Sequence, residues 1–434
     1  MSAIGVGILG CLLLLLLLLC SMPVALSMAI VGVVGFSVVV SPHAAGAMVT
    51  SDLLDTLSSY SLTVIPLFVF MGQVAFHSGI SQRLFKAAYY WLGPLPGGLA
   101  MATVGACTGF GAICGSGPAT AATMAAVALP EMKRYNYSME LAGGTVAAGG
   151  SLGMLIPPSV VFIVYGIMTE QSIGQLFVAG ILPGLLIATL FCLSIYIQCR
   201  LRPELGPRAE RVSWGMRWKS LLGVSETLIL FTAVMGGMFA GFFTPTEAAS
   251  VGAAGSVIIA LVRRKLTWAS LFRSLKETAR TSCMVMSIVA GAVVFGRFLA
   301  VTRIPYELAT WLTSLPAPAW VIIACIILFY LVCGCFVDAL GLLLLTVPVF
   351  YPVILELNYD LIWFGVIIVV VTQMGVISPP VGVNAYVVSG MERDIALQTV
   401  FKGVMPFLLC LIVAAALLVA FPQISLWLPS LVHP

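Results

Sequence analysis

Two short segments interrupt apolar stretches with residue types that suit binding chemistry. The first reads Gly-Ala-Ile-Cys-Gly-Ser-Gly-Pro-Ala-Thr at 111–120, and its Gly and Pro residues cannot continue a regular helix. The chain is therefore expected to turn back there. The second reads Val-Asp-Ala-Leu-Gly at 337–341 and carries Asp338 where the first carries Ser116. A carboxylate in so apolar a stretch is a functional hypothesis by default, and a structural cap at the turn is the alternative.

Two further segments, 149–159 and 372–384, each contain consecutive prolines, Pro157-Pro158 and Pro379-Pro380. Each pair removes two amide donors and disfavours helix in the preceding residue, so each helix is expected to unwind. Freed carbonyls would join side-chain oxygens from Ser116, Thr120, Ser151, Ser159, Asp338, Ser378 and Asn384. Such oxygens suit a hard cation, here sodium, and the amino ends of half-helices suit an anionic substrate. Alternatively, Gly and Ser only allow close helix packing.

The composition places these segments in a membrane. Of 434 residues, 61% are hydrophobic and 8% are charged, against about a quarter charged in soluble domains. Apolar stretches of about 20 residues, enough for one span, follow one another almost end to end. The run from Leu12 to Leu19 lacks a preceding Lys or Arg and is expected to be a retained first span rather than a signal peptide. We expect one all-α membrane domain without a soluble module.

The chain contains an internal repeat at an offset of about 220 residues. Pro157-Pro158 corresponds to Pro379-Pro380, and Gly153 to Gly375, 222 positions apart. Each half is predicted to hold five spans and one re-entrant hairpin, about ten full spans in all. Because five is odd, the second half (218–434) is inverted relative to the first (1–217).

The first repeat is divided into scaffold helices at 1–96, a hairpin at 97–131, a broken span at 139–168 and a span at 175–197. The second repeat is divided into scaffold helices at 221–300, a hairpin at 318–355, a broken span at 361–388 and a span at 401–428. Segment 265–281, which mixes charged residues with Trp268, is predicted to be a helix lying in the membrane interface. A plain cytoplasmic loop is the alternative.

Basic residues fix the predicted orientation. Two clusters flank the spans at 221–262, namely Arg200, Arg202, Arg208, Arg211, Arg217 and Lys219, then Arg263, Arg264, Lys265, Arg273, Lys276 and Arg280. The positive-inside rule assigns both to the cytoplasm. The same model puts Arg83, Lys86, Lys133, Arg134, Arg393 and Lys402 on that side. Both termini are then periplasmic.

Several other functions are disfavoured. The eleven Cys are spaced neither for zinc nor as a redox pair, so small packing residues are expected. Three His and no acid-rich motif argue against a membrane-embedded enzyme. The basic clusters flank spans, which argues against nucleic-acid binding. A channel would give flux without saturation, whereas a repeat with paired hairpins favours alternating access.

At the hairpin tips and the Pro-Pro segments, the sequence resembles the large membrane subunit, the M component, of tripartite ATP-independent periplasmic transporters. The matching stretches are Gly-Ser-Gly-Pro-Ala-Thr-Ala-Ala-Thr at 115–123, Leu-Ile-Pro-Pro-Ser at 155–159, Thr-Glu-Gln-Ser-Ile-Gly at 169–174, Ala-Gly-Ile-Leu-Pro-Gly at 179–184, Phe-Thr-Pro-Thr-Glu-Ala-Ala at 243–249 and Ser-Pro-Pro-Val-Gly-Val-Asn at 378–384. The resemblance implies an elevator-type transporter of the bacterial inner membrane. It also implies sodium sites between each hairpin tip and its broken span.

The resemblance further implies partners and site residues. The expected partners are a separate small membrane (Q) subunit, a periplasmic substrate-binding (P) protein, membrane lipid and an organic anion. The expected sodium ligands are Gly115, Ser116, Gly117, Ser151, Gly153, Pro157, Asp338, Gly375, Ser378 and Pro379. The expected substrate contacts are Ser116, Thr120, Ser159, Asn384 and Arg297. Arg297 has a second interpretation, as an anchor for the outer end of its span. The alternative function is an autonomous ion-coupled carrier without a binding protein.

Overall fold

The computed structural model describes residues 2–208, 212–314, 316–392 and 394–431, and within these ranges all regular structure is helical. Among them, six helices are long and apolar enough to cross a membrane. The number is seven if α11 (Trp214–Leu222) and α12 (Ser225–Phe239), bent by 48° at a short break, form one span. Six shorter apolar helices accompany them, and the expected total of about ten spans stays a prediction. Arg211 and Arg393, used above for orientation, lie outside the described residues.

The first half of the chain has the following helices: α1 (Ala3–Leu19), α2 (Val24–Val39), α3 (Pro42–Leu57), η1 (Tyr60–Thr63), α4 (Val64–His77), α5 (Ile80–Leu92), α6 (Gly98–Cys114), α7 (Gly117–Arg134), α8 (Met139–Ser151), η2 (Leu152–Met154), α9 (Val160–Thr169) and α10 (Ile173–Leu201). The structure interrupts α6–α7 at residues 115–116 and α8–α9 at residues 155–159. Both interruptions fall on the Gly, Ser and Pro clusters of the sequence.

The second half has these: η3 (Pro203–Leu205), α11 (Trp214–Leu222), α12 (Ser225–Phe239), α13 (Pro245–Val262), α14 (Trp268–Thr302), α15 (Ile304–Ser314), α16 (Ala319–Gly334), α17 (Ala339–Glu356), α18 (Leu361–Ile377), α19 (Val383–Met391), α20 (Leu397–Ala420), α21 (Gln423–Leu426) and η4 (Pro429–Leu431). The breaks between α16 and α17 and between α18 and α19 resemble those of the first half.

Local sequence explains where several helices begin and end. Thr244 caps α13 through the backbone N–H of Glu247 at 3.3 Å, and the Glu247 carboxylate accepts from the Thr244 N–H at 2.8 Å. This reciprocal capping satisfies two donors that a helix start leaves free. At the other end, Asn136 after α7 and Asn358 after α17 both adopt a left-handed conformation, with φ of 54°. Asn tolerates this conformation at a helix end.

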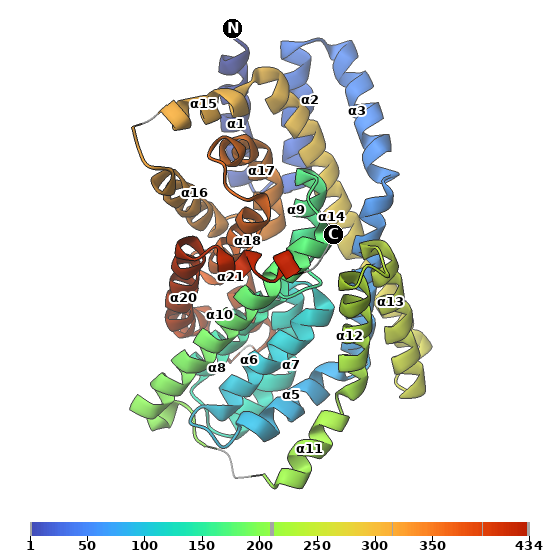
Figure 1. Cartoon of the computed structure of the whole chain (residues 1–434), viewed down its shortest axis with the longest axis vertical. Coiled ribbons are helices and arrows are strands. Elements are labelled where there is room, and N and C mark those ends of the chain that lie inside the picture. The colour runs from blue at the N-terminus through green and yellow to red at the C-terminus, as the bar shows by residue number, and fades with distance from the viewer. Residues whose placement is uncertain (1, 209–211, 315, 393, 432–434) are drawn as a thin grey trace.

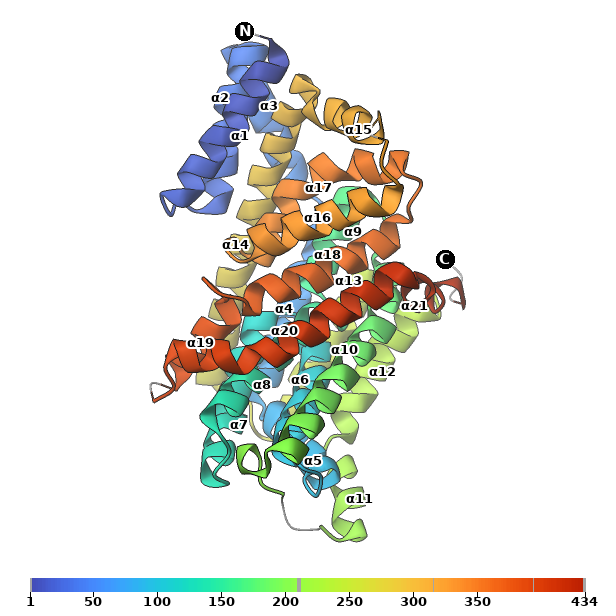
Figure 2. The ribbon, with the colours of Figure 1, turned by 90° about the vertical axis from the view of Figure 1, so that its left-hand side faces the viewer.

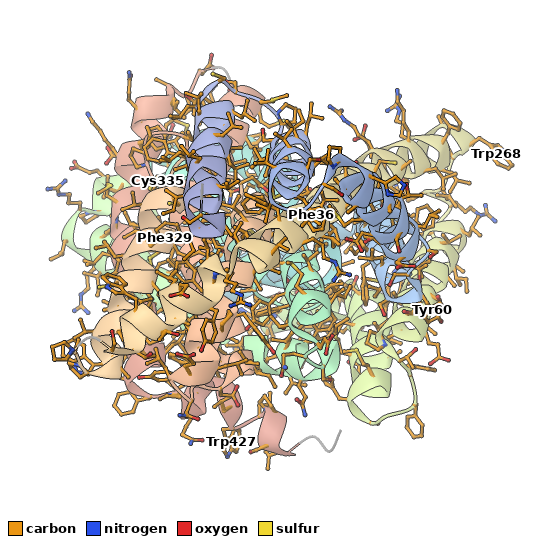
Figure 3. All side chains as sticks on the ribbon, turned by 90° about the horizontal axis from the view of Figure 1, so that it is seen from above. Phe36, Tyr60, Trp268, Phe329, Cys335 and Trp427 are labelled. Atoms are coloured by element: carbon orange, nitrogen blue, oxygen red, sulfur yellow. The ribbon has the colours of Figure 1, made fainter. Side chains whose placement is uncertain are left out.

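The predicted interfacial helix at 265–281 is wrong as a separate element. Residues 268–302 form one continuous helix, α14, of 35 residues. The reason is local, because neither Gly nor Pro occurs between Trp268 and Ala290, so nothing stops the helix from running on. The helix is longer than α2, α3 and α4, which pack against it. Trp268 at its start is 88% exposed and points outward at the periphery of the molecule (Figure 3).

The helices are arranged as an elongated bundle. The long helix α14 runs beside α2 and α3 (Figure 1). Turned by 90°, the molecule presents α16, α18, α20 and α10 as a slanted row of neighbours (Figure 2). Their packing depends on small residues, since Gly144 of α8 and Gly403 of α20 leave no room for a Cβ between their helices. The two interrupted helices α8 and α18 are almost wholly buried inside this bundle.

Candidate functional site

The tips of the two helical pairs, α6–α7 and α16–α17, meet at one cavity of about 330 Å³. Ser116 and Gly117 reach it from the first tip and Asp338 from the second, 222 positions along the chain. Met154 and Val160 reach it from the broken span of the first half. The sequence placed Ser116 and Asp338 at corresponding positions, and the fold brings both to the wall of the same cavity.

Three helices begin at this cavity, and they differ in how their first turns are satisfied. Asp338 caps α17, where its carboxylate accepts from the Leu340 N–H at 3.1 Å. Ser159 caps α9, where its hydroxyl accepts from the Phe162 N–H at 3.3 Å. Ser116, the residue before α7, makes no side-chain cap. The amino end of α7 therefore carries the partial positive charge of a helix start without a side-chain acceptor.

At the first tip, oxygens gather around Ser116. Its carbonyl accepts from the Thr120 hydroxyl at 2.8 Å and the Thr120 N–H at 3.0 Å. Gly153, from the unwound part of α8–α9, lies so close that an added Cβ would be 2.5 Å from Thr120 Oγ1 and 2.9 Å from the Ser116 carbonyl oxygen. Gly115 is similarly confined, because a Cβ there would lie 2.5 Å from the Pro158 carbonyl oxygen. Only glycine allows this approach of the two backbones.

The second tip packs on its broken helix in the same way. The Cys335 carbonyl accepts from the Val381 N–H at 3.3 Å, just as the Gly115 carbonyl accepts from the Val160 N–H at 3.3 Å. A Cβ on Gly375 would lie 2.5 Å from the Gly334 carbonyl oxygen. Ser378 donates to the Met374 carbonyl at 2.6 Å. Gly375, Ser378 and Pro379 thus belong to the region behind this tip, and they do not line the cavity with Asp338.

Three of the expected ligands use their polar groups inside the protein. Ser151 donates to the Ala148 carbonyl at 2.7 Å, and Ser159 donates to the Met154 carbonyl. The Asn384 amide donates to the Ala147 carbonyl at 3.0 Å. All three side chains are fully buried and lie outside the cavity wall, as do Thr120 and Pro157. In this structure the three side chains therefore stabilise the broken helices and do not contact the cavity.

Arg297 lies apart from the cavity. Its guanidinium makes two hydrogen bonds to the Asp52 carboxylate of α3, both at 3.1 Å. Asp52 is only 7% exposed, whereas the Arg297 side chain is 61% exposed. The proposed contact of Arg297 with a substrate carboxylate is therefore not the contact that this structure shows. Arg297 instead ties α14 to α3.

Replacing Arg297 with Gln is expected to lower stability by about 1–2 kcal/mol. The buried Asp52 charge would lose its partner, and the effect should fall below the roughly 3–5 kcal/mol of a fully buried pair because Arg297 is largely exposed. The thermal unfolding temperature of the purified chain measures this loss. The double variant Asp52→Asn, Arg297→Gln should regain the lost stability and should transport at the normal rate. A stable double variant without transport would instead return Arg297 to a role in substrate binding.

Three polar residues of the cavity wall were missed in the sequence, namely Gln73 of α4 and Glu277 and Thr281 of α14. Glu277 and Thr281 are four residues apart and so share one face of α14. Glu277 lies in segment 265–281, which the sequence predicted to be a helix in the membrane interface or a cytoplasmic loop, so it was not considered for the site. Among the described residues that line the cavity, none is Lys, Arg or His. The wall thus has two carboxylates, Asp338 and Glu277, without a cationic side chain.

Comparisons with known proteins extend over most of the chain. The family described as the tripartite ATP-independent periplasmic transporter, DctM component, matches residues 11–424. The C4-dicarboxylate TRAP transporter large permease protein DctM of Pseudomonas aeruginosa is 36% identical, over 87% of this chain and 88% of its own length. The sialic acid TRAP transporter large permease protein SiaM of Vibrio cholerae is 34% identical, over 88% of each. Among solved structures, the Alcanivorax borkumensis YdaH transporter superimposes with a TM-score of 0.63 at 14% identity, over 87% of this chain and 88% of that one.

Proposed function

The chain belongs to the DctM component family of tripartite ATP-independent periplasmic transporters, and from this premise we propose that it imports a small organic anion together with sodium. As a large permease of this family it is a multi-pass membrane protein and not an enzyme. The observation that carries the proposal is the cavity of about 330 Å³ at which Ser116 and Asp338 meet. Its volume is in the range of small-molecule sites.

The charges of the cavity wall support coupling to a cation. An organic anion is attracted by the uncapped amino end of α7, but it is repelled by the carboxylates of Asp338 and Glu277. Without a cationic side chain in the described wall, entry of the anion alone would be electrostatically unfavourable. Cations that enter with the anion would remove this repulsion. Sodium coupling thus gives a physical reason for carboxylates in a site for anions.

The oxygens at the first tip support sodium as that cation. The Ser116 carbonyl, the Thr120 hydroxyl and the backbone near Gly153 lie within contact of one another. Carbonyl and hydroxyl oxygens are the ligands that hard cations prefer. At the second tip, the carbonyls of Gly334 and Cys335 and the backbone at Gly375 form the corresponding group. We therefore propose one sodium ion behind each tip.

Contacts between the halves support an elevator movement of an inverted repeat. Each tip is bonded to its own broken helix through the Gly115 and Cys335 carbonyls. Asn384 of α19 donates to α8, and Lys133 in the last turn of α7 forms an ion pair with Asp394 at 2.6 Å. These bonds join the two hairpins, α6–α7 and α16–α17, and the two broken spans, α8–α9 and α18–α19, into one body. Gln73 and Glu277 face that body from α4 and α14, which belong to the proposed scaffold.

The proposed assembly follows from the family. The relatives are named large permease proteins, and a large subunit implies a small membrane subunit beside it. A periplasmic binding protein would deliver the substrate and dominate its selection. The chain would lie in the inner membrane of a bacterium, with both termini in the periplasm according to the basic clusters. An autonomous carrier of the same fold, without a binding protein, is the alternative.

Uptake into proteoliposomes tests the proposal. Vesicles that contain this chain with its small subunit should accumulate a radiolabelled organic acid only when the binding protein and an inward sodium gradient are both present. Replacement of sodium by choline at constant ionic strength is the control for the gradient. Uptake that requires sodium but ignores the binding protein would support the autonomous carrier. Uptake that ignores sodium would overturn the proposed coupling.

A further inference from the structure

Ser151 and Gln373 occupy corresponding positions in the two halves and contact each other. They lie 222 positions apart, and Ser151 Oγ is 3.5 Å from Gln373 Oε1. The same offset relates Gly153 to Gly375 and Pro157 to Pro379. Equivalent residues of two repeats can touch only where the axis that relates the repeats passes between them. This contact therefore marks the centre of the proposed moving body.

The surroundings of this contact are polar and fully enclosed. Ser151, Gln373 and Asn384 each have no exposed surface. Gln373 Nε2 and Asn384 Oδ1 have no hydrogen-bond partner among the described residues. Buried amide groups without partners lower stability. An apolar side chain of the same size would serve packing better, so a role other than stability is indicated.

The contact also lies between the two proposed sodium sites. Ser151 is two residues from Gly153, which touches the Ser116 carbonyl and Thr120 at the first tip. Gln373 is two residues from Gly375, which touches Gly334 at the second tip. A shift of either unwound segment on ion binding would therefore change the contact between Ser151 and Gln373.

We propose that the Ser151–Gln373 contact couples the two tips, so that sodium bound at one tip raises the affinity for sodium at the other. This inference rests on the proposed sodium sites and assigns Ser151 and Gln373 a positioning role between them. Such coupling is reciprocal, because each ion must change the affinity for the other by the same factor. Typical couplings change affinity by about 5-fold to 150-fold.

The test is the sodium dependence of the initial uptake rate in proteoliposomes with the complete transporter, at constant ionic strength. The unchanged chain should give a sigmoidal curve with a Hill coefficient near two, as expected for two coupled sites. Gln373→Met keeps the side-chain size and removes the amide. It should lower the Hill coefficient to about one and raise the half-saturating sodium concentration by at least about 5-fold.

Two further variants make the test specific. Ser151→Ala removes the other side of the contact and should flatten the curve in the same way, which also protects the test if Gln373→Met fails to fold. Thr145→Val is the matched control, because Thr145 is buried on the same helix α8 and its hydroxyl lacks a partner among the described residues. It should leave the sigmoidal curve unchanged.

The outcomes separate the two proposals. An unchanged chain that transports without any response to sodium would overturn the proposed function. A chain that responds to sodium with a Hill coefficient of one would overturn only the coupling. Sigmoidal curves that persist in both Gln373→Met and Ser151→Ala would also overturn only the coupling, because the contact would then not link the two sodium sites. Flattening in Thr145→Val as well would assign the effect to general packing and also overturn the inference.

Discussion

Asp338→Asn is expected to abolish sodium-driven uptake while the chain still folds. Asparagine caps a helix about as well as aspartate, so the bond to the Leu340 N–H at 3.1 Å is retained in this variant. The change removes only the negative charge from the cavity wall. Because that charge attracts the cation that enters the cavity with the anion, its loss should weaken cation binding by about 3 kcal/mol and lower transport roughly 100-fold. The initial uptake rate at low sodium, with expression verified, measures the effect.

The matched control is Asp360→Asn. Asp360 also caps a helix, since its carboxylate accepts from the N–H groups of Ile362 at 2.8 Å and Trp363 at 2.9 Å at the start of α18. It lies outside the cavity wall. The control should transport normally, because only a cap is altered and the cap is preserved. Full transport by Asp338→Asn would reduce Asp338 to a structural cap and show that its charge does not attract the coupling cation into the cavity.

Features that depend on residue type alone could be predicted from the sequence. Composition identified an all-helical membrane protein. Consecutive prolines at 157–158 and 379–380 indicated interrupted helices, and α8 and α18 do end shortly before them. Gly115 and Ser116 indicated a turn, and Gly115 has a φ of 66°, a conformation that other residues rarely adopt. In each case the backbone chemistry of one residue type decides the local conformation, whatever surrounds it.

Features that depend on contacts across the fold could not be predicted. Asp52 and Arg297 are 245 positions apart and pair only because α3 packs beside α14. Glu277 reaches the cavity because residues 268–302 form the single helix α14. Ser151 and Ser159 were predicted to bind sodium and substrate, respectively, because their side chains carry hydroxyl oxygens. A serine hydroxyl in a helix often bonds a nearby carbonyl instead, and the sequence does not show which of the two it does.

Gly153→Ala is expected to abolish transport and to lower stability by roughly 1–3 kcal/mol, the usual range for overfilling a packed site. The added methyl group would meet Thr120 Oγ1 at 2.5 Å and the Ser116 carbonyl at 2.9 Å. The first tip would have to move away from the broken span. That movement would separate the oxygens proposed to hold sodium. Thermal unfolding and uptake rate should therefore fall together.

Two comparisons assign this effect to the contact at the tip. Gly296→Ala in the last third of α14 adds the same methyl group where no atom of a neighbouring element lies within 4 Å. It should raise stability slightly, by about 0.5–1 kcal/mol, because alanine favours helix. The double variant Gly153→Ala, Thr120→Ala removes the hydroxyl that the methyl group meets and should recover part of the lost stability. Normal uptake by Gly153→Ala would show that the first tip does not need close contact with its broken span, and sodium would then have to bind elsewhere.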